Sequence, residues 1–272
     1  MPLFQFKYLE SEPFWFSGNQ LRIDHFNAAK EIPQVDLFSK QDIDLMALES
    51  WALFFDHDDT VGYKTSVNLL LLSFRIYSRG KPPFIKYRLC KENIRKCSRL
   101  TSPITYIHEL EENRLPYSKQ DLDIVDYGFR SLSEMDAVSP RCHNALYFLF
   151  LAFHTIHWIE SFMFLMTTLE AIFSKDKSGG ATRTICTRVS SFLGSKPRCK
   201  YQDIDHLYDI RSRIVHGNIA ASQEPGENLQ ELYHLQYVAR ECVAKLLNEK
   251  IYLHFVNKKS RDCYLGTLNV SR

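Results

Sequence analysis

Two short segments near the start of the chain alternate hydrophobic and polar residues, at positions 4–8 and 84–89. Because alternate side chains of a strand point to opposite faces of its sheet, both segments are predicted to be short strands. Between them, residues 65–78 are apolar at helical spacing, and Gly80 with the following Pro82–Pro83 pair would end such a helix. The pattern therefore predicts a small α+β unit within residues 1–138.

From Ser118 onward the hydrophobic pattern becomes helical. Ser118 and Asp121 are three positions apart, a spacing typical of side chains that cap a helix, and predict a helix over residues 118–135. Ser139 before Pro140 predicts the start of the next helix, because proline fits the first helical position. Residues 141–174 are apolar almost all round, as in buried helices of a bundle, and their length indicates two helices or one kinked helix.

Three more helices follow along the chain. Residues 181–193 and 201–216 are each followed by a glycine that suits a helix end, and residues 228–254 form a long amphipathic pattern. Short connections between successive helices favour antiparallel neighbours. We therefore expect a mainly α fold, in which residues 139–272 form an up-down helical bundle and residues 1–138 an α+β region of unknown role.

Composition limits the class of protein. The 272 residues are 45% hydrophobic and 24% charged, which is typical of a globular chain with a sizeable core. A net charge of only +2 argues against a uniformly basic nucleic-acid binder. Seven scattered cysteines without a Cys-x-x-Cys pair indicate a reduced, cytoplasmic protein without a zinc ribbon or a thioredoxin-type pair. No cofactor or metal is expected. No apolar run is long enough to span a bilayer, so no membrane association is expected.

Candidate chemistry is concentrated in residues 207–218, whose sequence is Leu-Tyr-Asp-Ile-Arg-Ser-Arg-Ile-Val-His-Gly-Asn. Arg211 carries a permanent planar charge that suits a phosphate. His216 is expected in the last turn of its helix, where exposed carbonyls favour an imidazolium and the ring can act as a general acid or base. Five positions correspond to a rotation of about 140° along a helix, so Arg211 and His216 do not share a face. Pairing of two such helices across a two-fold axis would bring both residue types into one cleft.

Three elements together resemble an Apea-like HEPN domain. Residues 207–218 contain that superfamily's arginine followed four to six residues later by histidine, and residues 169–173 (Leu-Glu-Ala-Ile-Phe) are similar to its Leu-Glu-Ala-Leu-Phe element. A helix carrying Arg188 and ending in Phe-Leu-Gly at residues 192–194 is the third. The resemblance implies a homodimer that cleaves RNA without metal. In this interpretation Arg211 stabilises phosphate charge and His216 moves the proton, which leaves 2′,3′-cyclic phosphate and 5′-hydroxyl ends.

Other residues are expected to support that site or to bind phosphate. They are Ser212, Arg213, Arg188, Glu170 and Asn218. Ser212 stands where many HEPN ribonucleases have Asn, Asp or His. Residues 175–213 contain nine basic and four acidic side chains, a local charge of +5 that suits a cleft following an RNA backbone.

Two interpretations of Arg211 and His216 stay open. They could be the catalytic pair of an endoribonuclease, and the family association implies anti-phage defence or toxin activity, with an antitoxin or another defence protein as partner. Alternatively, Arg211 makes a structural ion pair with Glu170 and His216 caps its helix. The chain would then be a non-catalytic module for dimerisation, RNA binding or sensing.

Overall fold

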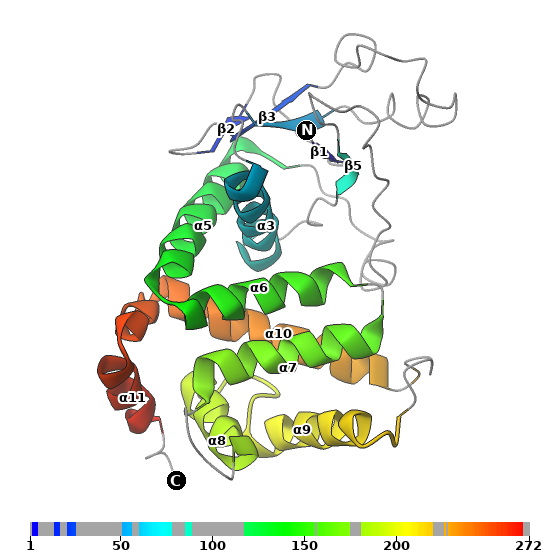
Figure 1. Cartoon of the computed structure of the whole chain (residues 1–272), viewed down its shortest axis with the longest axis vertical. Helices are drawn as coiled ribbons and strands as arrows, with labels where there is room; N and C mark the ends of the chain where they lie inside the picture. The colour runs from blue at the N-terminus through cyan, green and yellow to red at the C-terminus, as the bar shows by residue number, and fades with distance from the viewer. Residues whose placement is uncertain are drawn as a thin grey trace. The chain divides into compact units, whose positions relative to one another are not determined.

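The computed structural model describes most of the second half of the chain and several segments of the first. The described residues are 2–4, 14–16, 21–25, 51–55, 60–77, 85–88, 117–155, 157–174, 181–219, 226 and 228–268. The chain divides into two compact units, one made of residues 1–102 and 106–130, the other of residues 103–105 and 131–272. Helices predominate (Figure 1), which confirms the expected mainly α fold.

The first unit contains a sheet of five strands in the order β2-β3-β4-β1-β5, and each neighbouring pair is antiparallel. The strands are β1 (Pro2–Phe4), β2 (Phe14–Trp15), β3 (Leu21–His25), β4 (Trp51–Phe55) and β5 (Ile85–Arg88). The strand predicted at 84–89 corresponds to β5. Of the strand predicted at 4–8, only Phe4 lies within the described residues, where it ends β1.

Helix α3 (Thr60–Tyr77) begins five residues before the helix predicted at 65–78 and packs against the first part of α5 (Lys119–Val138). At their crossing, the Ser73 hydroxyl donates a hydrogen bond of 2.5 Å to the carbonyl of Val125. A Cβ atom at Gly128 would lie 2.5 Å from the Ser73 oxygen, so only glycine permits this approach.

Local capping interactions set where α5 and α6 begin. The Ser118 amide donates to the Asp121 carboxylate at 2.9 Å, which confirms the predicted cap of α5. Helix α6 (Pro140–His154) begins with Ser139 as its cap and proline at its first position, also as predicted. Residues 141–174 form two helices, because α6 is followed by α7 (Trp158–Phe173).

The second unit is a helical bundle centred on α7. This helix contacts α6, α8 (Ala181–Leu193), α9 (Tyr201–Val215) and α10 (Asn228–Asn248), and α6 and α7 run in opposite directions (Figure 1). The core side chains of α7 include Phe162, Leu165, Met166 and Leu169, all fully buried. Each contributes roughly 1.5–3 kcal/mol by leaving water. None of the described helices is both long and apolar enough to cross a membrane.

The helix predicted at 228–254 is wrong in its C-terminal part. Helix α10 ends at Asn248, and Lys250 adopts a left-handed backbone with φ of 52°. A left-handed residue interrupts helical hydrogen bonding, and the chain continues as the 3₁₀ helix η3 (Ile251–Val256). The change of direction buries Tyr252, whose hydroxyl donates to the Glu134 carboxylate at 2.6 Å.

A final helix, α11 (Lys258–Thr267), was not predicted from the sequence. Asn257 caps it, because its side-chain oxygen accepts a hydrogen bond of 2.9 Å from the amide of Ser260. The helix has few apolar residues, and only Arg261 and Leu265 of α11 are buried. Its cap was therefore the one local signal that could have identified it.

Candidate functional site

The C-terminal end of α9 is closed by a glycine turn. Gly217 has a φ of 75°, in the left-handed region that side chains with a Cβ rarely adopt. Its amide donates to the carbonyl of Ile214 at 3.1 Å, and the amide of Asn218 donates to that of Arg213 at 2.8 Å. This pair of bonds is the Schellman arrangement, which satisfies the last carbonyls of a helix. It fixes His216 as the residue at which the helix ends.

His216 caps α9 and does not lie in its last turn. Its amide donates to the carbonyl of Ser212 at 2.9 Å, while its side chain is exposed. Among the described residues, nothing forms a hydrogen bond or ion pair with the imidazole. The ring is therefore accessible to a molecule in solution, and both ring nitrogens are available for proton transfer.

Arg211 forms an ion pair that joins α9 to α7. Its Nη2 lies 3.2 Å from Oε1 of Glu170, and the two side chains are 33% and 29% exposed. The Nε of Arg211 is buried and has no hydrogen-bond partner among the described residues. This is the pairing that the structural alternative predicted, and it leaves part of the guanidinium exposed to solvent.

Glu170 sits in surroundings that disfavour its charge. Burial raises the pKa of the Glu170 carboxyl above its ordinary value, and the positive charge of Arg211 only partly opposes this effect. The charged form of Glu170 is consequently stabilised by the guanidinium of Arg211. The charges of Glu170 and Arg211 also act on a second residue of α9, Tyr208.

Tyr208 lies one helical turn before Arg211, and sequence reasoning did not include it in the site. Its side chain is buried, with 4% of the residue exposed, and its hydroxyl has no hydrogen-bond partner in the described part of the chain. Burial raises the pKa of this hydroxyl, the negative charge of Glu170 raises it further, and Arg211 lowers it. Glu170, Tyr208 and Arg211 therefore form one electrostatic cluster, named here the α7–α9 cluster. A spacing of three positions on a helix is the signal that could have found Tyr208.

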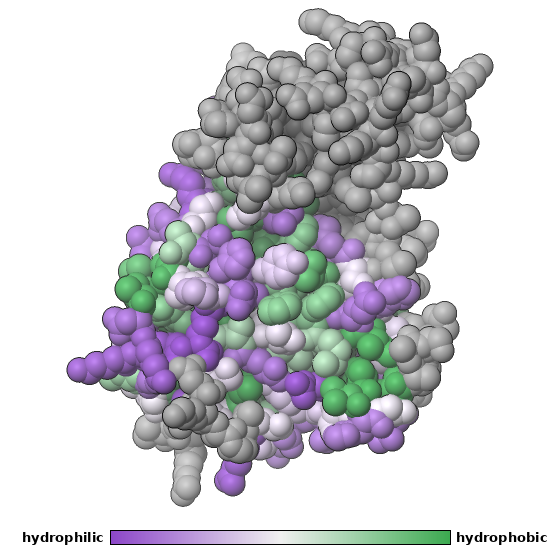
Figure 2. Space-filling model, in the orientation of Figure 1, coloured by the Kyte–Doolittle hydropathy of each residue, from purple (hydrophilic) through white to green (hydrophobic). Residues whose placement is uncertain are grey.

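The remaining residues predicted from the motif lie at the exposed end of α9. Ser212, Arg213 and Asn218 are exposed, as is His216. These residues and Arg211 thus lie in or just after the last two turns of α9, and Glu170 of α7 pairs with Arg211. Hydrophobic side chains accompany them: Figure 2 shows an apolar patch over the beginning of α7 and the end of α9. Val215, which is 55% exposed, belongs to this end of α9.

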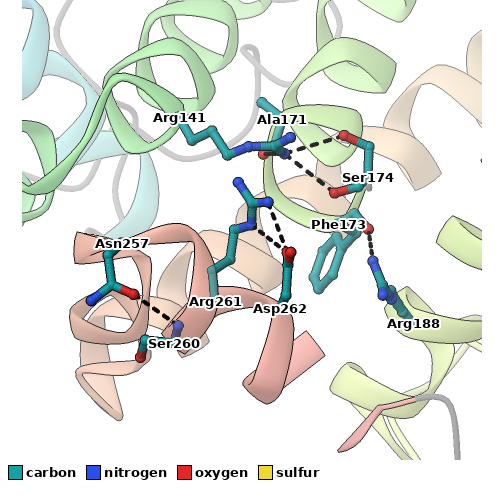
Figure 3. Close-up of polar contacts among 9 residues, drawn as sticks. All are labelled: Arg141, Ala171, Phe173, Ser174, Arg188, Asn257, Ser260, Arg261 and Asp262. Atoms are coloured by element: carbon teal, nitrogen blue, oxygen red, sulfur yellow. Dashed lines mark hydrogen bonds and ion pairs between the residues drawn. The ribbon is translucent and has the colours of Figure 1, made fainter. Parts of the chain in front are cut away.

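Arg188 is not at the exposed end of α9. Only 1% of this residue is exposed, and its Nη1 donates to the carbonyl of Phe173 at 2.5 Å. Figure 3 shows Arg188 and Arg141 at the end of α7, where Nη1 of Arg141 donates to the carbonyl of Ala171 at 2.9 Å. Both arginines donate hydrogen bonds to carbonyls at the C-terminal end of α7, where the helix dipole favours positive charge. Burial lowers the pKa of Arg188, and the charge of Asp262 opposes that shift.

Because Arg188 is buried, it does not contribute to the predicted basic surface. A guanidinium without contact to solvent cannot add to the charge that an RNA backbone meets. The exposed positive charge beside His216 comes instead from Arg213 and the accessible part of Arg211. Within the described ranges, no three His, Cys, Asp or Glu side chains are arranged to hold a metal ion.

Comparison with known proteins gives no relative for this chain. No protein-family model, curated protein or solved structure matches it. The resemblance to the HEPN superfamily therefore stays a prediction, based on residues 169–173, 188–194 and 207–218.

Proposed function

We propose that this chain is a metal-independent endoribonuclease of the HEPN class, which cleaves RNA at a site shared by two copies of the chain. One observation carries the proposal: α9 ends in an exposed histidine without a described partner, five positions after an arginine that is partly open to solvent. These are the proton-transfer group and the phosphate-binding charge that such cleavage needs. The bundle would then be an up-down HEPN-like domain.

The chemistry assigns a separate role to each residue. The RNA 2′-hydroxyl attacks the adjacent phosphorus and loses its proton to one His216, which forms the 2′,3′-cyclic phosphate. The 5′-oxygen leaves with a proton supplied by the other His216 of the dimer. Arg211 stabilises the negative charge on the phosphate during this exchange. RNA is the expected partner, and the expected setting is the cytoplasm, in anti-phage defence or as a toxin with an antitoxin or defence partner.

A homodimer explains how residues on different faces of α9 could act together. Arg211 and His216 are about 140° apart around the helix axis. Two copies of α9 related by a two-fold axis would place the histidine of one beside the arginine of the other. The apolar patch at the beginning of α7 and the end of α9 supports pairing at this end of the bundle (Figure 2), because exposed apolar surface favours association.

The test is RNA cleavage in EDTA with analysis of the fragment ends. We expect cyclic-phosphate ends from the wild type and none from His216→Ala. His206→Ala is the matched control, because His206 is also an exposed histidine of α9, with a side chain 55% exposed and 3.8 Å from Glu231. Equal cleavage by wild type and His216→Ala would remove His216 from the mechanism.

The Arg211–Glu170 ion pair favours a second candidate function. A guanidinium held at 3.2 Å from a carboxylate can serve the packing of α7 on α9 alone. The chain would then be a non-catalytic module for dimerisation, RNA binding or sensing. This candidate predicts that wild-type protein binds RNA or dimerises and leaves RNA intact. Gel-shift and sedimentation measurements, run beside the cleavage assay, separate the two functions.

A further inference from the structure

The buried hydroxyl of Tyr208 is an unusual feature beside the candidate site. Buried hydroxyl groups in folded proteins almost always have a hydrogen-bond partner, because an unpaired one lowers stability. Among the residues that the structure describes, the hydroxyl of Tyr208 has none, although phenylalanine would fill nearly the same space. A polar group kept at the expense of stability next to candidate catalytic residues indicates a function for that group.

The neighbours of Tyr208 indicate what that function is. Tyr208 and Arg211 are three positions apart, so both project from the same side of α9. The charges of Glu170 and Arg211 both act on the Tyr208 hydroxyl. Arg211 is the partner that the described residues give to Glu170, through a single contact of 3.2 Å. The α7–α9 cluster therefore contains one carboxylate and two donor side chains, of which only one is engaged.

Binding of a phosphate by Arg211 creates a problem at Glu170. If the guanidinium turns from the carboxylate to the phosphate, a partly buried negative charge loses its partner, which is unfavourable. A second donor that can reach the carboxylate would remove this penalty. An unengaged hydroxyl meets that need, because it gives up no existing hydrogen bond when it moves to Glu170.

We propose that Tyr208 is a positioning residue: its hydroxyl donates to the Glu170 carboxylate when the Arg211 guanidinium leaves that carboxylate for an RNA phosphate. This inference rests on the proposed function, since it assigns the phosphate to RNA. The number of polar partners of Glu170 is then the same before and after the exchange. Tyr208 thereby makes Arg211 available without touching the substrate itself.

Tyr208→Phe tests this role directly, because it removes only the hydroxyl. We expect kcat/KM for RNA cleavage to fall roughly tenfold to a hundredfold, the worth of a hydrogen bond to a charged group. The melting temperature is expected to stay equal or to rise, because an unpaired buried group is lost. Tyr252→Phe is the matched control: its buried hydroxyl does bond a carboxylate, that of Glu134, so this variant should melt lower and cleave normally.

A double-mutant cycle with Glu170→Gln separates positioning from packing. Without the carboxylate charge there is nothing for Tyr208 to compensate, so Tyr208→Phe should have no further effect in the Glu170→Gln background. An equal loss in both backgrounds, or unchanged cleavage by Tyr208→Phe, would overturn the role of Tyr208.

The affinity for a labelled RNA oligonucleotide, measured in the His216→Ala background, distinguishes failure of this inference from failure of the nuclease proposal. If the wild type does not cleave, but Tyr208→Phe weakens RNA binding only while Glu170 is present, the nuclease proposal fails and the exchange at Glu170 stands. A protein that neither binds nor cleaves RNA overturns both.

Discussion

Replacement of Arg211 by alanine gives the sharpest test of how α7 and α9 are joined. The substitution removes the guanidinium and leaves the Glu170 carboxylate without its partner at 3.2 Å. Burial raises the pKa of Glu170 in the folded protein, and the positive charge of Arg211 partly opposes this increase. Loss of Arg211 is therefore expected to raise the pKa of Glu170 further.

The expected loss of stability follows from how far the Arg211 and Glu170 side chains are exposed to solvent. Exposed ion pairs contribute about 0–1 kcal/mol, and breaking a buried pair costs about 3–5 kcal/mol. With side chains 33% and 29% exposed, the pair lies nearer the exposed limit. We expect Arg211→Ala to lower the free energy of unfolding by roughly 1–2 kcal/mol at pH 7, and the melting temperature by about 2–8 °C.

The pH dependence has a defined sign. A carboxyl whose pKa is raised on folding binds its proton more tightly in the folded state, so the protonated form favours folding below the ordinary value of 4.5. That contribution is lost as pH rises through the folded pKa. Because Arg211→Ala raises the folded pKa further, its destabilisation should be small near pH 4 and grow as the pH rises to 7.

Urea unfolding at pH 4 and pH 7, followed by circular dichroism, measures this difference. The Arg211→Ala, Glu170→Gln double variant is the control, because it has no carboxylate to leave unpaired and should show little pH dependence from this site. A destabilisation by Arg211→Ala that is the same at both pH values would refute the assignment of the effect to Glu170.

Three further predictions concern the described helices and cysteines. Gly217→Ala should lower the unfolding free energy by about 1 kcal/mol in thermal melts, because φ of 75° disfavours a Cβ. Asn257→Ala should cost about 1 kcal/mol and speed hydrogen exchange in α11, because the helix loses its cap. Among the described cysteines, only Cys263 is exposed and should react with iodoacetamide in the native protein. Burial raises the pKa of Cys186 to about 12, so its alkylation should require unfolding, as peptide mass mapping would show.

Local sequence signals predicted much of the helical architecture because they act over a few residues. The Ser118–Asp121 cap and the Ser139–Pro140 start each depend on bonds within three positions, and both are present. Gly194 and Gly217 adopt left-handed backbones at the ends of α8 and α9, as the glycine rule predicts.

Local sequence signals predicted only part of the candidate site. The motif identified Arg211 and His216 and suggested Glu170 as an ion-pair partner, which lies 41 positions earlier by their residue numbers. It placed Arg188 among the phosphate-binding residues, but tertiary packing buries that side chain against the end of α7. Whether an arginine faces solvent depends on the helices that surround it, and no local pattern encodes that.

Neighbouring residues set where most of the described helices begin and end, because capping and helical spacing act over a few positions. The tertiary structure decided where α10 stops, because the turn at Lys250 brings Tyr252 to Glu134, 118 positions away. It also decided which polar groups have partners, and so revealed that the Tyr208 hydroxyl has none among the described residues, although the charges of Glu170 and Arg211 act on it. Hydrogen-bond satisfaction depends on all the helices that meet at a point, and is fixed only when they pack.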